Sequence, residues 1–202
     1  MGKAAGELWR RFLAKRNNTM ITFRELVPED KDVIRSWRNT ADVAKYMYTD
    51  HAITVEEHEA WFQRIMRDST CKYWIIVCDG EDVGLVNLYA IDQRNRRCHW
   101  AFYIISPNVR GKGVGSYTEY FVFQHVFDEM KLNKLCCEVL AFNQTVVDMH
   151  KGFGFIQEGV FRKHVVKEGQ AQDVVCLGLL REEWEAKKAA LTEKMRAKGL
   201  LP

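Results

Sequence analysis

The run Arg110-Gly111-Lys112-Gly113-Val114-Gly115 decides the fold of this chain. It stands between an apolar extended segment, 100–105, and an amphipathic segment, 116–130. Glycines in this arrangement let the backbone turn sharply, and the N–H groups at the start of a following helix form a site for an anion. Arg110 and Lys112 add positive charge. The stretch therefore predicts a strand, a phosphate-binding turn and a helix in succession.

The glycine run differs from two common nucleotide-binding motifs. It lacks the Gly-Lys-Ser/Thr ending of a Walker loop, and no βαβ unit with an acidic partner accompanies it, as a dinucleotide fingerprint requires. A turn that only joins a strand to a helix is the alternative interpretation.

Composition narrows the class of protein. The 202 residues suffice for one domain with terminal extensions, and 47% hydrophobic residues can build its core. The six cysteines have neither C-x-x-C spacing nor clustered histidines, so we interpret them as reduced apolar side chains and expect no metal site. A net charge of +3 is too small to indicate nucleic acid and suits an anionic small molecule.

The chain shows no signal peptide and no apolar run close to the roughly 20 residues of a membrane span. We therefore predict a cytoplasmic protein with no integral membrane segment. Residues 1–19 form a basic extension whose spacing allows a short amphipathic helix, 20–180 form the domain, and 181–202 form a charged helix.

Periodicity predicts one α/β (α+β) domain with a largely antiparallel sheet. Helices are expected from Pro28, from Thr54 with a capping box to Glu57, from Gly115 and from Asn143. Strands are expected over 20–26, 73–78, 83–91, 98–105, 134–140, 156–166 and 171–179.

This order of elements, together with Arg110-x-x-Gly113-x-Gly115 and with Asn143 followed by Gly154-Phe155, resembles the GNAT family of N-acetyltransferases. The resemblance covers residues 20–180. It implies acetyl-CoA as cosubstrate, no metal, and a twisted, mostly antiparallel sheet that is splayed at the coenzyme site and flanked by helices.

The resemblance also implies which residues hold the coenzyme. One strand edge should pair with the pantetheine arm, the glycine turn should hold the pyrophosphate, and the Asn143 side chain should fix the thioester end. The expected coenzyme residues are Tyr103, Ile104, Ile105, Arg110, Gly111, Lys112, Gly113, Val114, Gly115, Ser116 and Asn143.

A narrower resemblance concerns the first two helices. Trp37-Arg38-Asn39, Met47-Tyr48-Thr49, Ile53 and His58 are similar to the acetyltransferases of pseudaminic acid biosynthesis. That subfamily acetylates the 4-amino group of a UDP-linked 4-amino-4,6-dideoxy sugar, which is a precursor of flagellin and surface glycans. Because Arg-Asn after an aromatic residue also occurs in acetyltransferases of ribosomal-protein N-termini, protein N-acetylation is the alternative function.

We expect five side chains to contact the sugar nucleotide. Arg38 suits the diphosphate, although a surface ion pair is the alternative. Met47 and Tyr48 offer an apolar and stacking surface, or else pack in the core. Asn87 and Trp100 are the expected contacts to the sugar, whereas Trp61 and Phe62 are assigned to the core.

Two residues are expected to carry the chemistry. Glu138, in the middle of an apolar strand, is our candidate for accepting the amine proton, with a salt bridge to a nearby arginine as the alternative. His150 stands where many relatives have a proton-donating Tyr, and it follows Asn143 by seven residues on the same helix face. Capping of the helix end is its alternative role.

His99 is a second candidate base or else makes a structural hydrogen bond. Strand alternation sends His99 and Trp100 to opposite faces, and the resemblance favours Trp100 as the pocket residue. A non-catalytic acyl-CoA-binding module is a third hypothesis, and a homodimer is an expected assembly. The grouping of Arg38, Met47 and Tyr48 favours the sugar-nucleotide enzyme.

Overall fold

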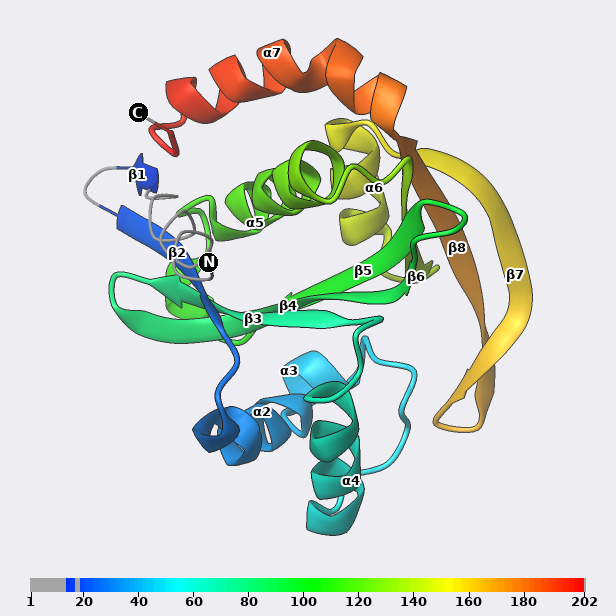
Figure 1. The fold of residues 1–202 in the computed structure, drawn as a ribbon. Helices are drawn as coiled ribbons and strands as arrows, with labels where there is room; N and C mark the ends of the chain where they lie inside the picture. Colours follow the sequence, from blue (N-terminus) through cyan, green and yellow to red (C-terminus); the bar gives the residue numbers. More distant parts are fainter. Residues whose placement is uncertain (1–13, 17–18, 202) are drawn as a thin grey trace.

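The computed structural model describes residues 14–16 and 19–201. They fold around an eight-stranded sheet with the order β1-β2-β3-β4-β5-β6-β8-β7 (Figure 1). All neighbouring strands pair antiparallel except β5 and β6, which are parallel. The strands are β1 (Ala14–Arg16), β2 (Thr19–Glu25), β3 (Lys72–Cys78), β4 (Glu81–Asp92), β5 (Arg97–Ile104), β6 (Lys134–Leu140), β7 (Ile156–Lys167) and β8 (Gln170–Leu180).

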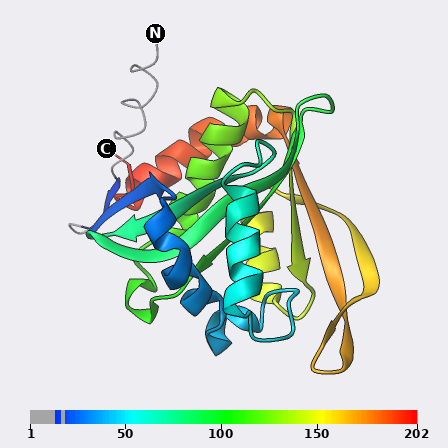
Figure 2. The same cartoon turned by 60° about the horizontal axis from the view of Figure 1, so that its bottom comes forward.

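Helices cover both faces of this sheet (Figures 1 and 2). The helices on one face are α5 (Val114–Phe123), α6 (Gln144–Phe153) and α7 (Arg181–Ala197), and α5 continues directly into a π-helical segment, Gln124–Glu129. The other face carries α2 (Lys31–Arg38), α3 (Ala41–Ala44) and α4 (Val55–Ile65). The predicted capping box forms, since Thr54 accepts from the Glu57 N–H and Glu57 accepts from the Thr54 N–H.

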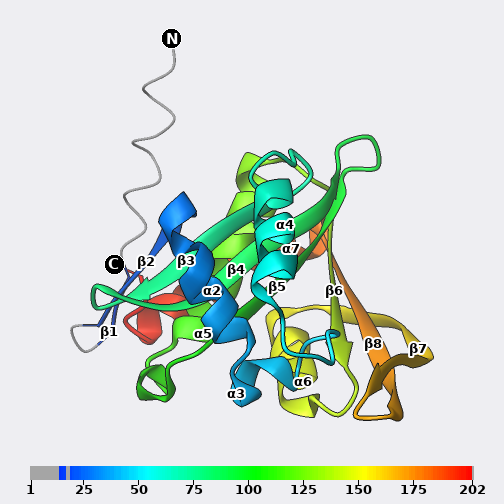
Figure 3. The ribbon, with the colours of Figure 1, turned by 90° about the horizontal axis from the view of Figure 1, so that it is seen from below.

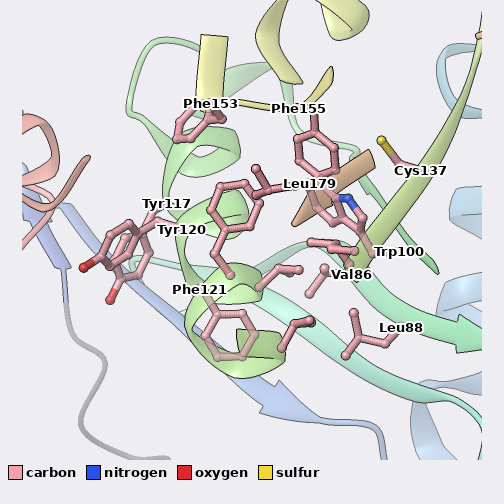
Figure 4. Close-up of a cluster of buried hydrophobic side chains, with 14 of the residues drawn as sticks. Val86, Leu88, Trp100, Tyr117, Tyr120, Phe121, Cys137, Phe153, Phe155 and Leu179 are labelled. Carbon is pink, nitrogen blue, oxygen red and sulfur yellow. The ribbon is translucent and has the colours of Figure 1, made fainter. Parts of the chain in front are cut away.

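Alternate residues of the strands sort into two apolar cores, as the period of two in a strand requires. Val86 and Trp100 belong to the larger core beneath α5 and α6 (Figure 4), and so does Trp74. Ile75 and Leu85 belong to the smaller core beneath α2 and α4. Neighbouring positions on one strand therefore serve different halves of the molecule.

β5 and β6 pair over three residues only, with Arg97 opposite Lys134 and His99 opposite Cys136. Beyond His99, β5 pairs with β4 alone among the described strands, through residues as far as Ile104. We call the space where the two strands part the β5–β6 opening. The splayed, mostly antiparallel sheet expected from the resemblance is thus confirmed.

The predicted strands and helices agree with the structure within a few residues, with two exceptions. Ala14–Arg16 form a strand paired to Thr19–Ile21, so the helix expected in the extension is wrong there, and the rest of that expectation lies outside the described residues. The short helix α3 was not predicted. No helix in the described part of the chain has the length and apolar character needed to cross a membrane.

Candidate active site

The layer of α2, α3 and α4 lies over one face of the sheet (Figure 3). Residues of this layer and of β3, β4 and β5 line a cavity of about 380 Å³. Its floor follows from strand register, because Tyr73 pairs with Asn87 on the next strand and Asn87 pairs with Ala101 beyond it. Cross-strand neighbours share a face of the sheet. The lining residues are Ile34, Arg38, Met47, Thr49, His51, Ile53, Glu57, His58, Trp61, Tyr73, Leu85, Asn87, Ala101, Phe102 and Tyr103.

Arg38 brings an uncompensated positive charge to this cavity. Its Nε is buried without a hydrogen-bond partner, and Arg38 pairs with no carboxylate among the described residues. Burial lowers the pKa of the guanidinium, which has Tyr103 and Tyr73 beside it. The sequence left open a surface ion pair for Arg38, and the described residues show no such pair. Arg38 is half-buried, and a cation partly removed from water without a counter-charge carries a desolvation cost that an anionic ligand would offset.

The segment between α3 and α4 brings Met47 and Thr49 to the cavity wall. Asn39 holds the far end of this segment, since its amide accepts from the Ile53 N–H at 2.8 Å and donates to the Ile53 carbonyl at 3.0 Å. Glu57, the one carboxylate among the described lining residues, is already engaged by the Thr54 N–H and by His51. The cavity thus presents a cation and no uncommitted anion.

Glu138 lies at the β5–β6 opening. It accepts a 2.7 Å hydrogen bond from the Tyr48 hydroxyl, and its Oε1 lies 4.0 Å from His99 Nδ1. Its side chain is 25% exposed, so solvent or a ligand can reach it. The arginine salt bridge considered above is absent from the contacts of the described residues, and Tyr48 makes this polar contact rather than packing in the core. Burial lowers the pKa of His99, which favours the neutral imidazole.

The edge of β5 faces the opening with alternate backbone groups. The Ile105 N–H donates to the Val83 carbonyl at 2.8 Å, and a Cβ on Gly84 would meet the Tyr103 carbonyl at 2.2 Å. Both observations show that the Tyr103 carbonyl and the Ile105 N–H point toward β4. Because ladder hydrogen bonds alternate, Ile104 is the expected coenzyme residue whose N–H and carbonyl point away from β4.

The glycine turn leads directly into α5. Gly113 is the N-terminal cap of the helix, has φ +86° and makes no side-chain capping bond. The helix interior supplies no acceptors for the first N–H groups, which belong to Val114, Gly115 and Ser116. These donors and the helix dipole form a site for an anion.

Other expected coenzyme residues lie around this turn. Arg110 and Gly111 are exposed, whereas Lys112 is drawn toward Asp79, with Nζ 3.4 Å from Oδ2. Asn143 is half-buried at the N-terminus of α6 and uses no side-chain capping bond, so its amide is available to a ligand.

Two expectations are corrected. Trp100 is 1% exposed and lies in the core beneath α6, on the face opposite Glu138, so it is not a pocket residue (Figure 4). His150 is 3% exposed, packs against Trp100 and bonds to Glu119 with Nδ1 2.9 Å from Oε1. Its helix face points into the core, so His150 neither caps the helix nor reaches the opening as a proton donor.

Several lining residues escaped the sequence analysis. Tyr73 and Ala101 are the cross-strand partners of Asn87 and therefore lie on the same face of the sheet. They could have been predicted only if the strand register had been known. Trp61 was assigned to the core, and it packs there while also lining the cavity. Thr49 and His51 lie in a connecting segment without regular secondary structure. Its sequence has no periodicity from which the orientation of their side chains could be predicted.

Comparison with known proteins places the chain in a family. Residues 20–156 match the model of the acetyltransferase (GNAT) domain, and the chain therefore belongs to the GNAT N-acetyltransferases. These enzymes use acetyl-CoA, and the open β5 edge and the helix N-terminus above fit such a ligand. Within the described residues, no group of His, Cys, Asp or Glu side chains could hold a metal ion.

Several relatives match at similar identity. Acetyltransferase PseH of Campylobacter jejuni is 28% identical over 155 residues, which are 77% of this chain and 90% of that protein. Spermidine N(1)-acetyltransferase of Escherichia coli is 25% identical over 166 residues, covering 82% and 89%. The putative ribosomal N-acetyltransferase YdaF of Bacillus subtilis is 24% identical over 180 residues, covering 85% and 97%.

Among solved structures, spermidine N-acetyltransferase from Vibrio cholerae, in complex with CoA and spermine, superposes with a TM-score of 0.75 at 22% identity. The superposition covers 82% of this chain and 98% of that one. This superposition shows that the fold is shared, while the acceptors named for the relatives differ.

The contact between Tyr48 and Glu138 has a measurable consequence. Burial, together with the hydrogen bond to Glu138, raises the pKa of Tyr48. In Glu138→Gln the anionic acceptor is lost, so the pKa of Tyr48 should fall toward its ordinary value while burial keeps it above that value. Titration of ¹³C-labelled tyrosine by NMR measures this, with Tyr48→Phe to assign the signal. An unchanged Tyr48 pKa would contradict the contact.

Proposed function

We propose that this chain transfers the acetyl group of acetyl-CoA to the 4-amino group of a UDP-linked 4-amino-4,6-dideoxy sugar. The observation that carries the proposal is Arg38, a half-buried arginine with a buried, unpartnered Nε and no counter-charge, in a cavity whose one carboxylate, among the described lining residues, is already bonded. An acceptor with a diphosphate supplies the missing anion. The likeness to PseH supports the same acceptor class.

The cavity favours this acceptor over a polyamine. A polyamine carries several positive charges and would meet Arg38 without a free carboxylate to offset the repulsion. Met47 and Asn87 offer an apolar surface and an amide, as a sugar with a methyl group and hydroxyls requires. The product would serve in pseudaminic acid biosynthesis, which supplies flagellin and surface glycans.

Acetyl-CoA would lie along the β5–β6 opening. The N–H and carbonyl of Ile104 would pair with the pantetheine amides, and the N–H groups of Val114, Gly115 and Ser116 would hold the pyrophosphate. Arg110 would add charge from the surface of the turn, and the Asn143 amide would bond near the thioester. The bound thioester supplies the carbonyl carbon that the acceptor amine attacks.

Glu138 would take the proton that the acceptor amine loses as the new C–N bond forms, directly or through one water molecule. Tyr48 keeps Glu138 in place by donating to it. Neutral His99, whose Nδ1 lies 4.0 Å from Glu138 Oε1, would accept this proton in turn through a water molecule, which leaves Glu138 ionised again. The C–S bond breaks as the amide forms, CoA leaves as its thiolate and takes a proton from water, and backbone N–H groups of the open β5 edge near Ile104 would stabilise the oxyanion in between.

The test is release of CoA thiol with purified protein and a panel of amines. The panel holds UDP-4-amino-4,6-dideoxy sugars of both stereochemical series, spermidine, and peptides with free N-termini. Rapid turnover of one sugar nucleotide alone supports the proposal. Turnover confined to spermidine or to peptides would replace it with polyamine or protein N-acetylation, and tight acetyl-CoA binding without turnover would favour a binding module. The homodimer stays a prediction.

Arg38→Met should raise KM for the sugar nucleotide by about 10- to 100-fold, because a charge-assisted hydrogen bond to phosphate is lost. KM for acetyl-CoA should stay unchanged. Steady-state kinetics at fixed ionic strength measures both constants. Arg64→Met, which removes an exposed arginine from α4, is the matched control. Equal effects of the two substitutions would argue against a diphosphate at Arg38.

Glu138→Gln should lower kcat by about 100-fold at neutral pH, which is typical for loss of a general base. The dissociation constant of acetyl-CoA should not change. Part of the lost rate should return as pH rises, since the amine then sheds its proton without help. Glu185→Gln, an exposed substitution on α7, controls for charge. A kcat within twofold of the parent would remove Glu138 from the reaction.

Gly113→Ala should weaken acetyl-CoA binding by about tenfold or more, because φ +86° strains an alanine and displaces the N–H groups that follow. A Cβ there would also lie 2.9 Å from the Leu200 side chain. Gly152→Ala, with open space around its Cβ, is the control and should bind normally. Isothermal titration calorimetry measures both, and parental affinity in Gly113→Ala would dismiss the turn as the pyrophosphate site.

A further inference from the structure

Lys167 joins two regions that are far apart in the chain. It ends β7, at the tip of the hairpin that β7 and β8 form on the outer edge of the sheet. Its Nζ donates to the Ala44 carbonyl at 3.2 Å and to the Thr49 carbonyl at 2.8 Å, and it lies 3.3 Å from Asp50 Oδ1. The three N–H donors of the ammonium thus have three acceptors, and the side chain is only 12% exposed.

Asp50 completes the attachment. Its second carboxylate oxygen accepts from the Glu168 N–H at 2.9 Å. That backbone bond, followed by the contact with Lys167, lowers the pKa of Asp50. The carboxylate is therefore ionised at neutral pH and ties the hairpin turn to the segment by one backbone bond and one ion pair.

The attached segment, 44–50, carries three residues of the candidate site, of which Thr49 lines the cavity and is bound by Lys167 through its carbonyl. Met47 lines the acceptor cavity, and Tyr48 donates to Glu138. Ala44 and Thr49 lie on either side of them, so Lys167 binds the segment at both ends. Between these points the backbone turns tightly, with the Tyr46 N–H on the Val43 carbonyl and the Met47 N–H on the Ala44 carbonyl, each at 3.0 Å.

We propose that Lys167 is a positioning residue for acceptor binding, which acts by holding segment 44–50 so that Met47 faces the cavity and Tyr48 faces Glu138. This proposal rests on the proposed function for the identity of the acceptor. Lys167 is not itself a lining residue and makes no hydrogen bond or ion pair with Glu138 in the described structure; it reaches the cavity wall only through the backbone carbonyl of Thr49. Its effect must therefore pass through the segment.

Charge alone does not explain this arrangement. Exposed ion pairs contribute little, whereas an ammonium bound to two backbone carbonyls and a carboxylate fixes a defined backbone geometry. Ala44 is also the last residue of α3, where a cation interacts favourably with the helix dipole. Loss of Lys167 would leave two carbonyls and Asp50 without this donor.

The test compares Lys167→Met with a substitution on the same strand, Lys163→Met. Lys163 is exposed, and its side chain has no hydrogen bond or ion pair to the segment in the described structure. Hydrogen exchange of the full-length protein without ligand reads the segment directly. We expect the amides of Tyr46 and Met47 to exchange about tenfold or more faster in Lys167→Met, with β3 unchanged. Asp50→Asn should raise the exchange rates of the same amides by a smaller factor. It replaces Lys167→Met as the test variant if Lys167→Met fails to fold.

Kinetics supplies the second measurement, with the UDP-amino sugar as acceptor. Lys167→Met should raise acceptor KM about tenfold and leave KM for acetyl-CoA within about twofold. Lys167→Arg, which retains the donors and charge, should restore much of the loss. A merely structural lysine would lower the melting temperature and raise both KM values together, and that outcome would overturn the proposal.

The two proposals can fail separately. If the parent protein does not acetylate the sugar nucleotide, the proposed function fails, while hydrogen exchange still decides whether Lys167 holds segment 44–50. Unchanged exchange at Tyr46 and Met47 in both Lys167→Met and Asp50→Asn would overturn the role of Lys167 even in an active enzyme.

Discussion

The parting of β5 and β6 is the constraint on which the rest of the structure depends. The two strands are parallel, so a crossover must connect them, and α5 is that crossover. The helix consequently begins beside the end of β5, at the edge where strand pairing with β6 has ceased. Unpaired backbone groups and a helix N-terminus then lie together, and both require a ligand or water to satisfy them.

The second constraint is the alternation of side chains along a strand. His99 and Glu138 share the face that carries the acceptor cavity, whereas their neighbours Trp100 and Cys137 lie in the opposite core. A shift of one residue in either strand would exchange a polar pair at the opening for an indole and a thiol. The large core beneath α5 resists this shift because Trp100 is almost fully buried there. Packing on one face thus fixes the chemistry on the other.

This division explains what could be predicted from the sequence. The strands, the capping box at Thr54 and the glycine turn are local patterns, so their positions followed from spacing alone. The face of each side chain did not, because it depends on register. Trp100 was assigned to the wrong face for this reason. Helical spacing from Asn143 predicted that the His150 side chain would face the same way as the Asn143 side chain. Asn143 is the N-cap and lies outside the regular helix, so the two side chains point in different directions.

The two halves of the site also differ in how they are assembled. Apart from Asn143, the proposed coenzyme half lies within Ile104 through Ser116, one continuous stretch that folds with its own strand and helix. The acceptor half combines α2, the segment after α3 and the hairpin tip, which are joined by Lys167 and Asp50 across more than a hundred residues. Such contacts leave no local periodicity. Relatives named for spermidine and for other acceptors share the fold at about 25% identity. Related enzymes can retain the local coenzyme half while the residues that make the long-range contacts of the acceptor half change. We therefore expect segment 38–53, and the hairpin that holds it, to determine which acceptor is bound.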